Sequence, residues 1–154
     1  MTGLTDYAGW LYVQPGMQAR LLALQDEAGQ DVLLLLAACW LGQRRVSSDP
    51  ELWAALHAAQ TPWREKVIQP LRGVRRYLAG IPPGAALYEQ VKACELSAEW
   101  HQLAVLERLC AGAPGTLDAP QTCMAAHLAL CCDGLEDVRL QELAAGAAGL
   151  VQLR

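Results

Sequence analysis

Two glutamates stand at positions where a helical core would place charge among apolar side chains. On the predicted helix 85–110, Glu95 and Gln102 fall within the apolar stripe and Glu99 falls at its edge, when successive residues are placed about 100° apart. Removing the partner of a buried charge costs about 3–5 kcal/mol. These glutamates therefore need cations nearby, and arginine suits them because its planar guanidinium can meet a carboxylate at two points.

The preceding predicted helix, 62–78, supplies those cations. A short connection at 79–84 makes the two helices antiparallel neighbours, and Arg64 and Arg75 flank the apolar stripe of the first one. We expect a buried polar cluster in which Glu95 and Glu99 pair with Arg75 and with Arg64 or Arg72. The cluster either fixes the packing of the two helices or lines a polar pocket for a small ligand. Shifted pKa values alone would not distinguish the two, because structural ion-pair networks shift the pKa values of their members as well.

The remaining basic side chains of this segment are candidates for binding a partner. Lys66, Arg72 and Arg76 are predicted to point outward, and Arg44 and Arg45 could extend the patch. Five charges are few for nucleic-acid binding, whose affinity scales with the phosphates neutralised. We expect an acidic protein partner rather than nucleic acid, with a solvated helix face as the simpler interpretation.

Cysteine and histidine also recur at helical spacing. Cys123, His127 and Cys131 are four residues apart and could present ligands on one helix face. Structural zinc sites usually draw on two paired ligand elements, however, and the sequence contains none. We therefore interpret the three residues as core and predict neither a metal nor a cofactor.

No catalytic residue is predicted. The chain has no Gly-x-Ser-x-Gly, no Gly-rich phosphate loop and no Glu-x-x-His pair, which are the local signatures of hydrolases, nucleotide-binding proteins and di-iron bundles. The expectation is a protein that is not an enzyme.

The elements that must position these residues are all helical. The 154 residues are 53% hydrophobic and 18% charged, with a net charge of −4, so the chain is large enough for one core. We predict an all-α, single-domain irregular bundle of six to eight helices over 1–154, with a weakly ordered tail from about 143. Pro70 predicts a kink or break, Asp118 a helix cap, and Thr61-Pro62 a new helix start.

The sequence predicts a cytoplasmic protein. The first residues lack a secretory signal, and the longest apolar run, 32–41, is far shorter than the roughly 20 residues that span a bilayer. The six cysteines are expected to be reduced.

Three blocks carry a resemblance to a known family: "DYAGWLYVQPGMQARLLALQDEAGQDVLLLLAACWLG" (6–42), "WREKVIQPLRGVRRYL" (63–78) and "VKACELSAEW" (91–100). Together they resemble a proteobacterial family of conserved hypothetical proteins, domain of unknown function 2390. The resemblance implies a cytosolic, all-helical bacterial protein with no assigned activity, and it transfers no catalytic residues.

Two functions follow as expectations. The first is an interaction or adaptor protein that uses its Arg-rich helix face, and the alternative is a small-molecule-binding or enzymatic bundle with a Glu/Arg pocket. Arginines that face solvent would favour the first, and arginines that converge on a cavity with the glutamates would favour the second.

Overall fold

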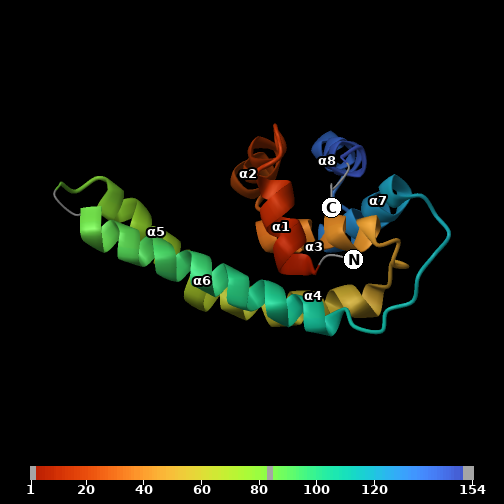
Figure 1. Ribbon diagram of the computed structural model, residues 1–154, viewed down its shortest axis with the longest axis horizontal. Coiled ribbons are helices and arrows are strands. Elements are labelled where there is room, and N and C mark those ends of the chain that lie inside the picture. Colours follow the sequence, from red (N-terminus) through yellow and green to blue (C-terminus); the bar gives the residue numbers. More distant parts are fainter. Residues whose placement is uncertain (1–2, 83–84, 151–154) are drawn as a thin grey trace.

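The chain folds into helices joined by turns and loops. The computed structural model describes residues 3–82 and 85–150, and over these residues the predicted all-α bundle is confirmed (Figure 1). The elements are α1 (Leu4–Tyr12), α2 (Met17–Ala28), α3 (Val32–Gln43), α4 (Pro50–Trp63), the π-helical turn η1 (Arg64–Ile68), α5 (Gln69–Ala79), α6 (Ala85–Leu109), α7 (Pro120–Cys131) and α8 (Val138–Ala148).

Helix α3 is the centre of the fold. Every residue from Leu33 to Gly42 is buried, so the helix has no face left for solvent. The Asp31 side chain begins it by accepting a hydrogen bond from Leu33 N at 2.9 Å, as predicted for an N-cap. A helix that is apolar all round has to be covered on every side.

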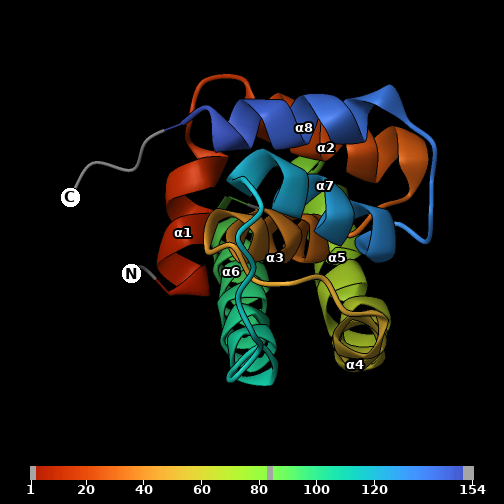
Figure 2. The same cartoon turned by 90° about the vertical axis from the view of Figure 1, so that its right-hand side faces the viewer.

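Four short helices provide much of that cover. Helix α7 packs most extensively against α3, and α1, α2 and α8 close the other sides (Figures 1 and 2). In α8, Leu143, Ala144 and Ala147 are buried. Helix α8 thus continues through 143–148, where the sequence predicts a weakly ordered tail, because alanines that give no amphipathic signal still pack in a core. Residues 151–154 of that tail lie outside the described residues.

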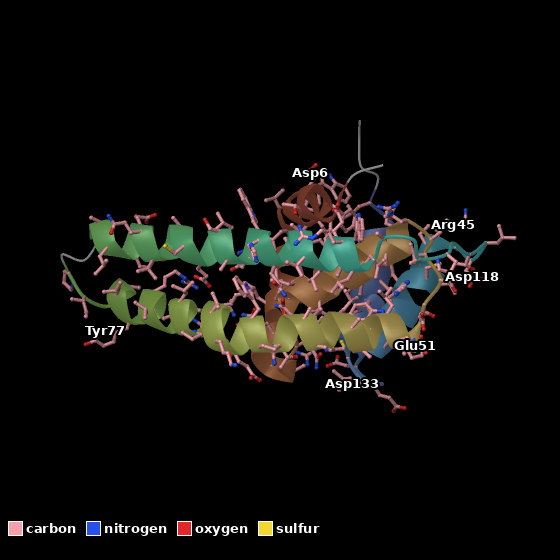
Figure 3. The ribbon with its side chains drawn as sticks, turned by 90° about the horizontal axis from the view of Figure 1, so that it is seen from below. Asp6, Arg45, Glu51, Tyr77, Asp118 and Asp133 are labelled. Carbon is pink, nitrogen blue, oxygen red and sulfur yellow. The ribbon has the colours of Figure 1, made fainter. Side chains whose placement is uncertain are left out.

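Helices α1, α2, α3, α7 and α8 form the body of the protein. The remaining elements, α4, η1, α5 and α6, form an arm that projects from this body. Helices α4, η1 and α5 run on without a break, and α6 returns antiparallel beside them (Figures 1 and 3). No residue of α5 is buried, and Tyr77 near the tip points outward (Figure 3) with 72% of its surface exposed. The arm is thus a two-helix layer, and its sides stay open to solvent or to a ligand.

The arm corrects two sequence predictions. Pro62 lies inside α4 and does not start a new helix. Pro70 lies in the first turn of α5, and the irregularity sits upstream of it as the π-helical turn η1. Pro70 has no backbone N–H to donate. A π turn holds more residues than an α turn, so the helix accommodates the missing hydrogen bond without ending.

The apolar stripe of the predicted helix 85–110 predicts a core face of Leu87, Val91, Cys94, Ala98, Val105 and Leu109. This prediction is wrong over much of the length of α6. Leu87, Cys94 and Leu109 are exposed, whereas Leu103 and Leu106 are buried. The N-terminal half of α6 contacts little besides α5, so only the C-terminal half faces the body.

The loop between α3 and α4 (44–49) pairs with the loop between α6 and α7 (110–119). Val46 and Gly115 form an isolated antiparallel bridge, and the Arg45 guanidinium donates to the carbonyl oxygens of Leu117 and Asp118 at 2.5 and 2.8 Å. The N-cap of α7 is Ala119 without a side-chain bond, so the prediction that Asp118 caps this helix is wrong.

Among the helices of the described residues, none combines the length and the apolar character that crossing a membrane requires.

The contact between α3 and α7 yields a stability prediction. A Cβ added at Gly42 would lie 2.6 Å from the Met124 backbone Cα, so Gly42→Ala should force the two helices apart. We expect a loss of about 3 kcal/mol or more in the free energy of unfolding, measured by urea denaturation, since overpacking a core typically costs 1–3 kcal/mol.

Gly73→Ala in α5 is the matched control, because its Cβ would meet nothing within 4 Å. It should stabilise the protein by about 0.5–1 kcal/mol, the ordinary gain from alanine in a helix. Equal effects of the two substitutions would show that α3 and α7 do not pack at Gly42.

Candidate functional site: a cleft between the arm and the body

A cleft of about 820 Å³ lies where the arm meets the body. Its lining comes from α1 and α2 on one side, α5 and α6 on the other, and the start of α3 with the end of α4 at its base. The polar and charged side chains that line it are Tyr12, Gln18, Gln25, Asp26, Gln30, Asp31, Gln60, Arg64, Gln69, Arg72, Arg75, Arg76, Tyr88, Lys92, Glu95 and Glu99.

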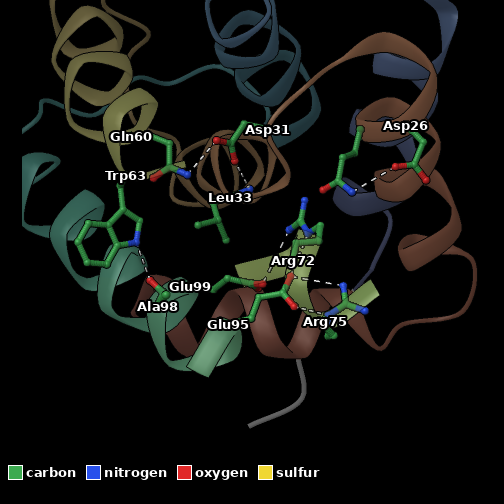
Figure 4. A network of polar contacts seen from close by, with 11 residues as sticks. Asp26, Asp31, Leu33, Gln60, Trp63, Arg72, Arg75, Glu95, Ala98 and Glu99 are labelled. Atoms are coloured by element: carbon green, nitrogen blue, oxygen red, sulfur yellow. Dashed lines mark hydrogen bonds and ion pairs between the residues drawn. The ribbon is translucent and has the colours of Figure 1, made fainter. Parts of the chain in front are cut away.

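Glu95 is the anchor of the arm-side wall. Its residue is only 5% exposed, and two arginines of α5 hold its carboxylate (Figure 4). Arg72 Nε donates to Oε2 at 2.9 Å. Arg75 Nε donates to Oε1, and Arg75 Nη2 lies 3.5 Å from Oε2. Both oxygens are therefore bonded, and the cluster joins α5 to α6.

The arginines keep this buried carboxyl ionised. Burial raises the pKa of Glu95, but the hydrogen bonds from Arg75 and Arg72 and their positive charges outweigh it, so the pKa lies below its usual value. The same hydrogen bond raises the pKa of Arg75.

Glu99, one turn further along α6, has a different environment. Its closest cation is Arg72, whose Nη2 lies 3.9 Å from Oε1, and no described residue donates a hydrogen bond to its carboxylate. Burial, followed by the negative charge of Glu95, raises the pKa of Glu99 to about 6. Two carboxyls on one helix face thus have pKa values that are pushed apart.

A second polar group lies at the base of the cleft. Asp31 caps α3 with Oδ1 and accepts a hydrogen bond from Gln60 Nε2 on Oδ2 at 2.8 Å (Figure 4). Arg64 Nη1 lies 3.8 Å from the same Oδ2. Gln60 Oε1 and Arg64 Nε are buried without a hydrogen-bond partner among the described residues.

The predicted polar cluster is present in part. The contact of Arg75 with Glu95 exists, and Glu99 lies beside it. Arg64 pairs with Asp31 and not with the glutamates, and Gln102 is buried but donates to Ala59 O at 3.0 Å, apart from the cluster.

The three predicted outward-facing cations do not form one patch. Arg72 takes the second of the two positions that the sequence left open for it, because its side chain is 21% exposed and bonded to Glu95. The turn η1 contributes to this: a π turn adds about one residue per turn, so residues after it rotate relative to a regular α-helix. Lys66 is exposed away from the cleft, whereas Arg76 is exposed and lines it.

Several lining residues were not predicted. Tyr12 of α1 lines the cleft, and burial and the charge of Glu99 raise its pKa. Lys92 lies on the arm side of the cleft, where Leu96 and Trp100 are 46% and 57% exposed. No local sequence signal marks these residues, because their place in the wall depends on how α1 and α2 dock.

The weak metal candidate has a structural role. Trp53 Nε1 donates to His127 Nδ1 at 3.0 Å, and His127 Nε2 lies 2.8 Å from Val46 O. Both ring nitrogens are thus engaged, and burial lowers the pKa of His127. Cys123 and Cys131 are buried nearby on α7, and the residues described include no group of three or more side chains arranged to hold a metal ion.

Comparison with known proteins adds a family. The model of a family described as "Protein of unknown function (DUF2390)" matches residues 4–106. This range includes α1 to α5 and most of α6, and so every residue that lines the cleft. Neither the curated proteins nor the solved structures include a significant match.

The Glu95 cluster yields a coupling prediction. Glu95→Ala removes the carboxylate that both arginines bind, and Arg75→Ala leaves that buried carboxylate half-bonded. Each should therefore lower the free energy of unfolding by about 2–4 kcal/mol. The double variant should lose less than the sum, with a coupling energy of about 1–3 kcal/mol in a denaturation cycle.

The exposed pair Arg20–Glu142, 3.3 Å apart, is the control cycle. Its coupling should not exceed about 1 kcal/mol, as for surface ion pairs in general. Additive effects at Glu95 and Arg75 would mean that the two residues are not coupled.

Proposed function

Because the chain belongs to the DUF2390 family, whose function is unknown, we propose its function from the cleft alone: a non-enzymatic protein that binds a small, amphipathic organic anion. The observation that carries the proposal is the convergence of Arg72 and Arg75 with Glu95 on a cleft of about 820 Å³. Clefts of a few hundred to about 1,000 Å³ are typical of small-molecule sites.

The charge of the arm-side wall favours an anion. Arg76 and Lys92 line the cleft and make no ion pair with the described residues. Arg72 and Arg75 add two charges, which the carboxylates of Glu95 and Glu99 offset. A ligand carboxylate, phosphate or sulfonate would therefore meet more cations than anions, in a concave site where the field is focused.

The rest of the lining favours a ligand with an apolar body. Leu22, Leu33 and Leu36 contribute from the body side, and Leu96 and Trp100 contribute from α6. Apolar walls with a few convergent polar groups are the usual composition of an organic-ligand site.

The orientation of the arginines supports this proposal over an adaptor surface. Arg72 and Arg75 turn to the cleft with the glutamates instead of presenting an outward basic face, and Lys66 lies elsewhere. A cytoplasmic adaptor with an acidic partner stays a prediction. The described lining contains no Ser, Thr, Cys or His, so it offers no aliphatic hydroxyl, thiol or imidazole as a nucleophile.

Anilinonaphthalene sulfonate, an amphipathic anion that fluoresces in apolar sites, is a suitable probe. It should bind the wild type, and the double variant Arg76→Gln, Lys92→Gln should weaken binding about tenfold, because two unit charges at close range in a largely aqueous site contribute about 1–2 kcal/mol. A fluorescence titration measures the dissociation constant.

Arg108→Gln with Lys66→Gln is the matched control. It removes the same two charges outside the cleft, and Arg108 occupies the last turn of α6 as Arg76 does in α5. Its affinity should change less than about twofold, since both side chains are exposed and neither lines the cleft, and salt screens exposed charges. Equal weakening in both double variants, or no binding by the wild type, would refute the proposal.

A further inference from the structure

The two glutamates of the cleft share the arginines unequally. Glu95 takes hydrogen bonds from both Arg72 and Arg75, whereas Glu99 has only the 3.9 Å approach of Arg72 Nη2. Its side chain is 28% exposed and lines the cleft. One carboxyl is thus saturated by protein donors, and the other lies free at the surface where a ligand would bind.

The charged surroundings of Glu99 come from four helices. Glu95 on α6 and Asp31 on α3 oppose its negative charge, and Arg72 and Arg75 on α5 favour it. Tyr12 on α1 faces it as a neutral phenol. Burial and the neighbouring carboxylates prevail, because Glu95 already engages both arginines, and they hold the pKa of Glu99 near 6.

An anion in the cleft would shift this balance further. It would compete for the field of Arg72 and Arg75 and add a negative charge close to Glu99, and both effects favour the neutral carboxyl. Linkage then requires that protonation of Glu99 strengthens anion binding by the same factor.

We infer that Glu99 takes up a proton from solvent when an organic anion enters the cleft and then donates a hydrogen bond to it. This inference rests on the proposed function and adds which chemical group of the ligand the site recognises. The ligand must carry an anionic oxygen that accepts the Glu99 O–H, as a carboxylate, phosphate or sulfonate does. Glu99 becomes a specificity-determining contact, and Glu95 stays the ionised anchor of the arginines.

The test is the pH dependence of binding of anilinonaphthalene sulfonate at constant ionic strength. The sulfonate stays ionised between pH 5 and 8, so any linkage belongs to the protein. Affinity should increase by about tenfold as the pH falls from about 7.5 to 6, since one linked proton gives at most a tenfold change per pH unit.

Glu99→Gln separates this group from every other titratable side chain of the protein. The variant keeps the shape of the side chain and an N–H donor, so it should bind at pH 7.5 about as tightly as the wild type binds at pH 6. Its affinity should change less than twofold over the pH range. Glu65→Gln, which removes an exposed carboxylate of η1 outside the cleft, should retain the wild-type pH dependence.

Calorimetry in two buffers of different ionisation enthalpy counts the proton directly. The wild type should take up a substantial fraction of one proton per probe bound at pH 7, and Glu99→Gln should take up none. Probe binding without proton uptake, or with uptake unchanged in Glu99→Gln, would overturn this inference while the proposed function stands. No binding by the wild type would overturn both.

Discussion

The complete burial of α3 is the constraint from which the rest of the structure follows. A helix with apolar residues on every side has no stable arrangement until other helices surround it, and α7 lies so close that Gly42 has no room for a side chain. The helices that cover α3 come from both ends of the chain, so the termini fold onto the same core. Only the C-terminal half of α6 takes part in this cover, and the other half is left to project with α5.

The cleft is a consequence of that division. Because the arm projects from the body (Figure 1), its inner side lines the cleft together with α1 and α2. Charged residues that a closed bundle would exclude from its core remain partly solvated there. Asp31 links the two regions, because one of its oxygens caps α3 and the other holds Gln60 at the end of the arm's first helix. The geometry of the site is therefore tied to the start of the central helix.

Sequence patterns predict the helical class well, and some helix starts are local: Asp31 and Asp49 accept hydrogen bonds from the first residues of α3 and α4. The same patterns indicated that Glu95 needs arginines. They left Arg72 open between an outward position and the glutamates, because a wheel of regular α-helix cannot represent the extra residue of η1. Pro70 indicated an irregularity, but whether a helix breaks or accommodates a π turn depends on its neighbours. Tyr12 was missed for a related reason, since its place opposite Glu99 depends on how α1 docks.

The energetics of the ion cluster argue for a role beyond stability. Replacing buried ion pairs by well-packed apolar residues is often neutral or stabilising, and a hairpin of two helices could be joined by leucines at the positions of Arg72, Arg75 and Glu95. Leucines would not, however, fix two guanidinium groups beside a cleft, nor would they leave Glu99 next to a carboxylate that has already taken both arginines. What the charged cluster supplies in place of packing is a rigid, polar wall and one unsatisfied acid, and both are properties of use to a bound anion.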